Sequence, residues 1–466
     1  MAIDSMNTLS RDALRWMDAL WDPSANLLWY EASASRAEQP RRHMVRESCW
    51  YALGLCMRNA AGDVARANTT VGAVLSQQYH APGAIWHGTW SRAPEDAAPV
   101  SGALIWRDYD PNWRQFVGAT LLILWRAFPE LLSVENKSRI AGALRAAVSG
   151  EPAERVDARY TNIAMLRAWL EVEAGELLHE STCVARGEAL AAAVLERYGR
   201  CGALDEFNSP TYYGVDLLAA ALWARQSRRL AVSGARIEAM LWQDIANFYH
   251  AGLQNLCGPY VRAYGVDLAV YVGLISLWLR QIDDAAPLPP INVDLKHGHD
   301  LCLAPFIELL GVCVPALAKG ALSRFGGERQ QLRRLPGGAI ATAWLSDELM
   351  IGGLAGSRIT ARDQFHPATV HWVSRERAVA ESQPARHWLR LRSDGPLQAS
   401  AARGELRLAF GASQRVRIEN SCGAAVALAA ADALQFPGLR IVVAQVAAHQ
   451  ETQTYRMQFA LQHEQQ

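Results

Sequence analysis

The sequence has 466 residues, of which 50% are hydrophobic and 20% are charged, a composition typical of globular proteins with a large core. Lys plus Arg and Asp plus Glu number 46 each, so the formal net charge is zero. Nucleic-acid binding as a main function is therefore not expected, because it needs an excess of positive charge. A local basic pocket for one acidic sugar is still compatible with this balance, since net charge does not describe a single cleft.

The N-terminus lacks a targeting signal. It has an early acidic residue and no apolar run behind a basic start, so we expect a cytoplasmic protein. No uncharged apolar stretch reaches the roughly 18 residues of a membrane-spanning helix. The eight cysteines are scattered without metal-binding spacing, and no glycine-rich phosphate loop is present. The sequence thus predicts no cofactor and no metal, although a bound calcium ion stays open because its oxygen ligands leave little sequence trace.

Residues 8 to about 320 are predicted to be helical. Apolar residues recur there at three- and four-residue spacing, which is typical of amphipathic or buried helices. Turn signals rich in Gly, Asn, Asp and Pro separate these segments. The clearest predicted helices cover residues 184–198, 213–230 and 237–253.

From about residue 330 onward the apolar period changes to two, which is typical of strands. Predicted strands cover residues 388–391, 405–410, 415–418, 439–446 and 454–461. Several short strands at close spacing indicate an antiparallel β-sandwich. We therefore predict two domains, a helical and catalytic domain over residues 1–325 and a sandwich over residues 326–466.

Five segments of the helical half combine Asn or Arg with Tyr, Trp or His. They are residues 43–48, 109–114, 160–163, 206–214 and 260–265. Their spacing is about 50 residues between the last four, which is the signature of a repeated helix hairpin. If one helix of each hairpin lines an (α/α) toroid, all five segments lie at one mouth, where helix N-termini favour an anionic ligand. Ordinary helix capping is the alternative interpretation of their Asn, Ser and Pro residues.

The segments HMVRESCWYALGL, DYDPNWRQFVG, YTNIAMLRAW and EFNSPTYYGVDL resemble those of a group of uncharacterised fungal and bacterial proteins. The segment GGLAGSRITARDQFHPATVHW is similar to a strand pair of the same group. The combination of a helical toroid and an antiparallel sandwich resembles heparinase-, alginate-lyase- and chondroitin-lyase-like proteins. This resemblance covers most of the chain and implies an α+β fold, an N-terminal (α/α) toroid followed by the sandwich. It is specific for fold, since no segment reproduces the active-site motif of one lyase family.

The resemblance implies a carbon–oxygen lyase that cleaves a uronic-acid-containing oligosaccharide or polysaccharide by β-elimination. That reaction needs a group that neutralises the sugar carboxylate, a base for the C5 proton and an acid for the leaving oxygen. Similar lyases use Asn or Arg for the first task and Tyr or His for the others. A cationic cleft is expected to lower the pKa of the tyrosine used. The catalytic candidates are Asn162, Asn208, Tyr212, Tyr213, Tyr264, His43 and His366, with His87 as a secondary base.

Substrate binding is predicted for arginines that hold carboxylates and for tryptophans that stack on sugar faces. The candidates are Arg46, Arg114, Arg262, Asn112, Trp86, Trp90 and Trp113. Structural alternatives exist, because Arg46 can pair with Glu47, Tyr264 can be a packed aromatic residue and His366 can brace a domain interface. The pair His297 and His299 lacks a clear third metal ligand, so a polar loop is the preferred interpretation.

Other function classes remain open. An inverting glycoside hydrolase would need two carboxylates roughly 6.5–9.5 Å apart. Acidic residues available for that role are Asp110, Asp205, Glu206 and Asp267. A non-catalytic glycan-binding protein and a small-molecule dehydratase or cyclase are further alternatives. Since no signal is visible, we favour an exo-acting or oligosaccharide lyase with an acidic glycan as its partner, and neither nucleic acid nor membrane.

Overall fold

The computed structural model describes residues 6–30, 42–292, 295–359, 364–374, 385–430, 432–448 and 451–462. The chain divides into two compact units, each built from segments that are far apart in the sequence. The first unit comprises Met1–Leu195, Asp216–Ile237 and Pro289–Val312. The second unit comprises Glu196–Val215, Glu238–Leu288 and Cys313–Gln466. The domain division predicted at residues 325 and 326 stays a prediction.

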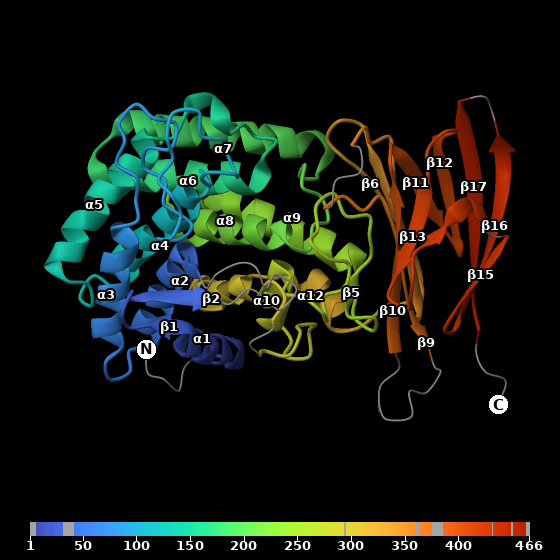
Figure 1. The fold of residues 1–466 in the computed structure, drawn as a ribbon, viewed down its shortest axis with the longest axis horizontal. Helices are drawn as coiled ribbons and strands as arrows, with labels where there is room; N and C mark the ends of the chain where they lie inside the picture. Colours follow the sequence, from blue (N-terminus) through green and yellow to red (C-terminus); the bar gives the residue numbers. More distant parts are fainter. Residues whose placement is uncertain are drawn as a thin grey trace. The chain divides into compact units, whose positions relative to one another are not determined.

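Helices follow one another along the N-terminal part of the chain (Figure 1). They are α1 (Thr8–Leu20), α2 (Val45–Arg58), α3 (Asp63–Leu75), α4 (Trp113–Ala127), α5 (Val134–Ser149), α6 (Thr161–Leu178), α7 (Ser181–Cys201), α8 (Tyr212–Gln226), α9 (Ala231–Phe248), α10 (Leu274–Arg280), α11 (Ala304–Leu310) and α12 (Ala316–Ser323). Short strands accompany them, namely β1 (Trp21–Asp22), β2 (Leu27–Tyr30), β3 (Arg42–Met44), β4 (Tyr249–His250) and β5 (Asn255–Leu256). The three helices predicted most clearly correspond to α7, α8 and α9. The last of these ends before the predicted residue 253, because the chain turns into β4.

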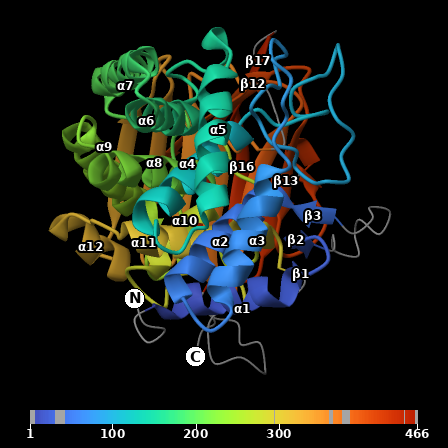
Figure 2. The same ribbon diagram turned by 90° about the vertical axis from the view of Figure 1, so that its left-hand side faces the viewer.

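The first unit is built from helix hairpins with inner and outer members. Helices α2, α4 and α6 are apolar on nearly all sides and almost completely buried, as expected for helices surrounded by others. Helix α2 packs against both α3 and α4, and α4 packs against both α5 and α6 (Figure 2). The residues that directly follow α2 and α6, Asn59 and His179, both adopt the left-handed conformation that commonly closes a helix.

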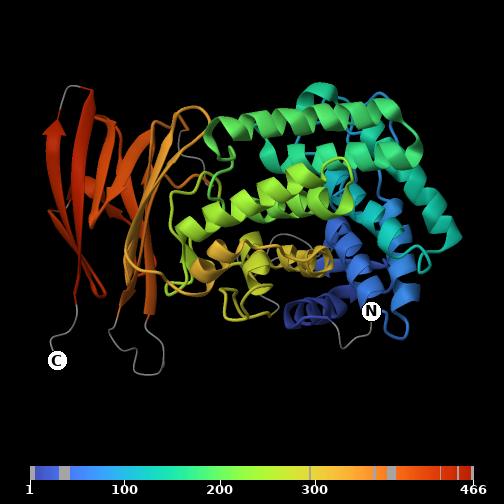
Figure 3. The ribbon, with the colours of Figure 1, turned by 180° about the vertical axis from the view of Figure 1, so that it is seen from behind.

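The C-terminal part of the second unit is a sandwich of two antiparallel sheets (Figures 1 and 3). The first sheet has the order β14-β13-β10-β9-β8-β7-β6, and the second has the order β11-β12-β17-β16-β15. The strands are β6 (Arg329–Arg334), β7 (Ile340–Leu345), β8 (Leu349–Ala355), β9 (Ala368–Ser374), β10 (Ala385–Ser393), β11 (Leu397–Ala402), β12 (Glu405–Gly411), β13 (Val416–Asn420), β14 (Val426–Ala427), β15 (Ala433–Phe436), β16 (Leu439–Ala448) and β17 (Thr452–Leu461).

Alternation of buried and exposed residues creates the core between the two sheets. In β11, for example, Leu397, Ala399 and Ala401 are buried while the residues between them are partly exposed. Strand β8 differs, since its first six residues are all buried. A close approach explains this difference, because a Cβ added at Gly352 would lie 1.9 Å from the carbonyl oxygen of Gly258. The segment around Gly258 therefore covers the outer face of β8.

The fold class predicted from the sequence, helix hairpins followed by an antiparallel β-sandwich, is confirmed. Strands β10, β12, β13, β16 and β17 lie where alternating runs were predicted. Among the helices within the described ranges, none combines the length and the continuous apolar character needed to cross a lipid bilayer.

A buried histidine connects the helical and sandwich parts of the second unit. The Nδ1 atom of His250 accepts the backbone N–H of Leu253 at 3.0 Å, so Nε2 carries the proton and donates to the carbonyl of Ser346 at 2.8 Å. The ring stacks on Phe325 with centroids 3.9 Å apart. Burial lowers the pKa of His250 from 6.5 to about 4. The native state therefore holds a neutral imidazole that the unfolded chain protonates more easily.

Acidification is expected to destabilise the second unit through His250. Because the pKa is lower in the folded state, the stabilising effect is complete above pH 6.5 and is lost as the pH falls toward about 4. The loss is on the order of 3 kcal/mol for one site. Urea unfolding between pH 7 and pH 4.5 measures it, with His250→Gln as the test variant and the exposed His80→Gln as the matched control. An equal acid dependence in wild type and His250→Gln would contradict this assignment.

Candidate active site

A loop of the second unit, residues 260–266, forms hydrogen bonds with strand β9 and the segment just before it. The backbones of Tyr260 and His366 exchange two hydrogen bonds, at 3.0 and 2.9 Å, and the N–H of Ala263 donates to the carbonyl of Gln364 at 2.7 Å. Farther along, the carbonyl oxygen of Val266 lies 2.8 Å from Nε2 of the buried His371. The residues between positions 260 and 266 are thus held in one conformation.

The start of helix α8 is joined to the same loop. Asn208 adopts a left-handed backbone with φ of 50° and is buried. Its side-chain amide donates to the carbonyls of Cys257 and Pro259, at 2.7 and 2.9 Å. The hydroxyl of Ser209 donates to the carbonyl of Arg262 and accepts the N–H of Tyr212 at 3.0 Å, which caps the helix. These contacts fix the position of Tyr212 relative to Arg262.

Five side chains then meet in what we name the tyrosine–arginine cluster: Glu206, Tyr212, Arg262, Tyr264 and Gln364. The hydroxyls of Tyr212 and Tyr264 lie 3.1 Å apart. Arg262 donates through Nη2 to the Tyr212 hydroxyl at 2.8 Å and through Nη1 to Glu206 at 2.7 Å. Its guanidinium also lies over the Tyr212 ring, 3.9 Å from the centroid. The side-chain Oε1 atom of Gln364 accepts from the Tyr212 hydroxyl and from Nε of Arg262, both at 3.4 Å.

The members of the cluster differ in exposure. Tyr264 is 40% exposed, the Arg262 side chain is 34% exposed, and Glu206 is buried. Burial, followed by the neighbouring Tyr264, raises the pKa of Tyr212 well above its ordinary value, and the charge of Arg262 only partly opposes this. The expectation that a cationic cleft lowers the pKa is therefore wrong for Tyr212. Of the two tyrosines, Tyr264 is the more exposed.

The other predicted residues of the second unit lie outside the cluster. Tyr213 is fully buried and packs edge-on against Phe207. His366 is fully buried, with Nε2 3.2 Å from the carbonyl oxygen of Ala263.

Two acidic candidates of the second unit also lie outside the cluster. Asp205 accepts two hydrogen bonds from Arg197, both at 2.5 Å. Asp267 accepts the backbone N–H of Ala269 at 2.9 Å. Catalytic roles for these residues stay predictions.

Arg46 lies in the first unit inside a cage of aromatic rings. Its guanidinium carbon is 4.6 Å from the ring centroid of Trp50 and 4.5 Å from that of Trp113. It donates to the neighbouring Glu47 through Nε at 3.0 Å and Nη2 at 2.5 Å, so the structural ion pair considered from the sequence is present. Burial alone would lower the pKa of Arg46, but the charge of Glu47 and then that of Asp300 raise it above its ordinary value.

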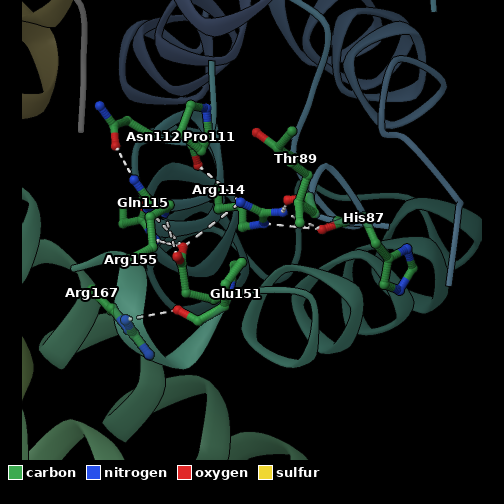
Figure 4. Close-up of polar contacts among 12 residues, drawn as sticks. His87, Thr89, Pro111, Asn112, Arg114, Gln115, Glu151, Arg155 and Arg167 are labelled. Carbon is green, nitrogen blue, oxygen red and sulfur yellow. Dashed lines mark hydrogen bonds and ion pairs between the residues drawn. The ribbon is translucent and has the colours of Figure 1, made fainter. Parts of the chain in front are cut away.

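A second polar network of the first unit surrounds Glu151 (Figure 4). Its carboxylate accepts from Arg155 at 2.5 and 2.8 Å and from Gln115 at 2.8 Å. Burial alone would raise the pKa of Glu151, but the hydrogen bonds from Arg155 lower it below its ordinary value. Arg155 also donates to the side-chain Oδ1 of Asn112 at 2.8 Å, and Nδ2 of Asn112 donates to the Tyr160 hydroxyl at 2.8 Å. The amide of Asn112 is therefore engaged within the protein.

Arg114 is completely buried at the edge of this network (Figure 4). It donates to the carbonyl of Ile85 at 2.7 Å and to that of His87 at 2.6 and 3.0 Å. Burial lowers its pKa to about 10, which still leaves the guanidinium charged at neutral pH. These contacts hold the loop before helix α4, and the substrate-binding role predicted for Arg114 stays a prediction.

The remaining predicted residues also belong to the first unit. Trp90 is fully buried, and Trp86 lies edge-on to Tyr109 with ring centroids 6.2 Å apart. Asn162 is buried in the first turn of α6.

The two predicted histidines of the first unit both contact other protein groups. The ring of His43 lies between two carboxylates, with Nδ1 2.5 Å from Glu95 and Nε2 3.2 Å from Asp22. His87 accepts the backbone N–H of Ala81 at 3.2 Å, and burial lowers its pKa.

Several members of these clusters were missed by the sequence analysis. Glu151 and Arg155 are four residues apart, a spacing at which side chains meet on one helical turn and which was a usable signal. Gln364 joins the tyrosine–arginine cluster from a segment more than 100 positions away from Arg262, and no local pattern points to it. Asp300 directly follows the His297–His299 pair and was passed over.

No curated protein is detectably similar to the chain in sequence. Among solved structures, it is similar to heparinase III, with a TM-score of 0.45 and 8% identity over 98% of this chain and 83% of that one. It is also similar to the chondroitin AC lyase of Streptomyces coelicolor A3, with a TM-score of 0.46 and 10% identity over 97% of this chain and 76% of that one. These are the kinds of protein that the sequence resembles. In sequence, residues 7–311 match the family described as a domain of unknown function (DUF8769), and the chain belongs to that family.

Proposed function

We propose that this protein is a carbohydrate-active enzyme, a lyase that cleaves a uronic-acid-containing glycan by β-elimination. The observation that carries the proposal is the pair of tyrosine hydroxyls 3.1 Å apart, one of which accepts a hydrogen bond from an anchored arginine. This arrangement combines proton-transfer groups with a fixed positive charge, the two requirements of elimination next to a carboxylate.

The reaction breaks and forms a small set of bonds. A base removes the proton from C5, which lies next to the sugar carboxylate. The C5–H electron pair forms the C4=C5 double bond, and the C4–O bond to the leaving sugar breaks. An acid delivers a proton to the leaving oxygen. A tyrosine that does both begins as the tyrosinate, takes the C5 proton and passes it to the leaving oxygen, so it ends the cycle in its starting state.

Tyr264 is the member of the cluster that we assign to contact with the substrate. Tyr264 is 40% exposed, which makes it accessible from solvent. The Tyr212 hydroxyl, 3.1 Å behind it, is kept protonated by burial and can donate to Tyr264. The negative charge that the Tyr264 oxygen carries before it takes the proton and after it gives the proton away is stabilised by this hydrogen bond and, through Tyr212, by Arg262.

Arg262 is assigned to electrostatic stabilisation of the acidic sugar. Its guanidinium is held by Glu206, Tyr212 and Gln364, so the positive charge is fixed before the substrate arrives. In this proposal Arg262 takes the carboxylate-neutralising role that the sequence analysis also considered for Asn208. The amide of Asn208 donates to two backbone carbonyls and is assigned the task of shaping the loop.

A glycoside hydrolase is the second candidate, because one carboxyl group has a suitable environment. Burial raises the pKa of Asp110 in the first unit, and a raised pKa is what a general acid of a hydrolase needs. Among the other acidic candidates, Asp205 accepts a hydrogen bond from Arg197 at 2.5 Å and Glu206 accepts one from Arg262 at 2.7 Å.

Ultraviolet absorbance during incubation with a panel of uronic-acid oligosaccharides tests the proposal. Elimination creates an unsaturated uronate that absorbs, whereas hydrolysis does not, so we expect a rise with at least one acidic oligosaccharide. New reducing ends without a rise in absorbance would contradict the lyase and favour the hydrolase. Neither signal across the panel would contradict both and favour a glycan-binding or small-molecule function.

A further inference from the structure

Two imidazoles and one carboxylate gather in the first unit at the start of the 3-10 helix η4 (Gly298–Leu303). His297, His299 and Asp300 each offer one ligand atom, and these atoms lie within 4.8 Å of one another. We propose that these three side chains bind a divalent transition-metal ion of the zinc type. This site does not depend on the lyase proposal, because it uses none of the residues of the tyrosine–arginine cluster.

The distances are close to those of a metal site. Ligand atoms bound to tetrahedral zinc at about 2.0–2.1 Å are separated from one another by roughly 3.4 Å. Nε2 of His299 and Oδ1 of Asp300 are already 3.6 Å apart. The two imidazole rings, with centroids 5.7 Å apart and planes inclined by 62°, lie beside each other. Small rotations of the side chains therefore suffice to bring all three ligand atoms around one ion.

The backbone that carries the three side chains is firmly held. The N–H of Asp300 donates to the carbonyl of His297 at 3.0 Å, and the N–H of Gly298 donates to that of Leu295 at 2.9 Å. A Cβ added at Gly298 would lie 3.1 Å from the ring of Trp16, so the segment is closely packed. The following residues Leu301–Leu303 are buried. Binding a metal here requires little ordering of the chain, which favours affinity.

Charge also favours a cation at this place. The Asp300 side chain is only 7% exposed, and among the described residues its carboxylate accepts no hydrogen bond within 3.5 Å. The nearest cationic group described is Arg46, whose Nη2 atom is 3.9 Å away and is paired with Glu47 at 2.5 Å. One guanidinium thus faces two carboxylates, and the local charge is negative when the imidazoles are neutral. A bound cation supplies the positive partner that the Asp300 carboxylate lacks.

The donor set indicates the class of metal. Neutral imidazole nitrogens suit zinc and its first-row neighbours, and a carboxylate oxygen completes a three-ligand set. The His299 side chain is 36% exposed, so the site opens toward solvent on one side. Three protein ligands with remaining positions open to water or a ligand are typical of accessible rather than purely structural zinc sites.

Titration of the metal-free full-length protein with Co²⁺ tests this site, since cobalt replaces zinc and its visible absorption reports imidazole coordination. We expect one equivalent to bind and to be displaced by Zn²⁺. His299→Ala and Asp300→Asn should each weaken binding at least about tenfold, because losing a ligand costs no less than losing its outer-shell partner. The exposed His80→Ala should bind like wild type.

Circular dichroism of each variant accompanies the titration, and His299→Ala is the decisive variant because its side chain is partly exposed. A folded His299→Ala protein that binds Co²⁺ as tightly as wild type would overturn the proposal. The absence of stoichiometric binding to wild type would overturn it as well. Equal weakening in His80→Ala would show nonspecific binding and would have the same consequence.

Discussion

Tyr264→Phe is expected to lower kcat/KM on an acidic oligosaccharide by about 10²–10⁴-fold, the usual range for loss of a general acid–base group. The substitution removes one oxygen atom from a residue that is 40% exposed. Tyr212 keeps its hydrogen bond from Arg262 at 2.8 Å, and Arg262 keeps Glu206 at 2.7 Å, so the rest of the cluster remains in place. The change therefore tests proton transfer by Tyr264 with little disturbance of charge or packing.

The matched control is Tyr455→Phe in the same unit, whose hydroxyl contacts Gln453 at 3.2 Å within the sandwich. It should leave both kcat/KM and the thermal midpoint near the wild-type values. Initial rates of ultraviolet absorbance change, together with thermal unfolding of both variants, provide the comparison. If Tyr264→Phe retained wild-type turnover, the assignment of Tyr264 as the acid–base residue would fail, although the lyase activity itself could still stand.

Much of the fold could be predicted from the composition and from the periodicity of apolar residues in the sequence. The alternating run of residues 405–410 became β12 (Glu405–Gly411), and that of residues 454–461 became β17 (Thr452–Leu461), because one face of each strand meets the sandwich core. Alternation did not reveal strand β8 (Leu349–Ala355), since a strand buried on both faces shows none, and only the resemblance of residues 352–372 to a strand pair pointed to it. The segment that covers it, around Gly258, lies more than 90 positions earlier in the sequence, and no local pattern reveals that contact.

The candidate site was predictable only in part, for a similar reason. Tyr212, Arg262 and Tyr264 were singled out because aromatic and basic residues recur at helix starts, and the structure brings these three together. Asn208 carried the same kind of signal, yet its amide donates to two backbone carbonyls. Sequence alone does not distinguish an amide that binds a ligand from one that supports a loop, because that choice depends on which distant carbonyls lie within reach.

For Arg114, too, the sequence does not tell whether the side chain binds a ligand or supports a loop. Arg114→Met is expected to lower the free energy of unfolding of the first unit by about 3 kcal/mol or more. Methionine fills much of the buried space, but the carbonyls of Ile85 and His87 lose the donors that now lie 2.6–3.0 Å away. Each buried carbonyl left without a partner costs roughly 1–3 kcal/mol.

Glu151 is expected to add little to the loss of free energy of unfolding caused by Arg114→Met. The Arg114 guanidinium is 3.9 Å from the Glu151 carboxylate. Arg155 and Gln115 donate hydrogen bonds to the same carboxylate at 2.5–2.8 Å, and these bonds remain after the change. The expected loss therefore arises mainly from the loop carbonyls and less from an unpaired charge. Urea and thermal unfolding measure it, with Arg107→Met as the control, because Arg107 is an exposed arginine that pairs with the adjacent Asp108.

The two interpretations of Arg114 predict opposite outcomes. If Arg114 holds the loop before α4, Arg114→Met lowers the unfolding midpoint, and at temperatures where it is folded it retains much of its affinity for the substrate. If Arg114 binds a sugar carboxylate, the midpoint stays near that of the Arg107→Met control while KM rises. The complete burial of the side chain and its donation to two backbone carbonyls favour the first outcome. An unchanged midpoint with a raised KM would show instead that the arginine leaves these carbonyls when the substrate binds.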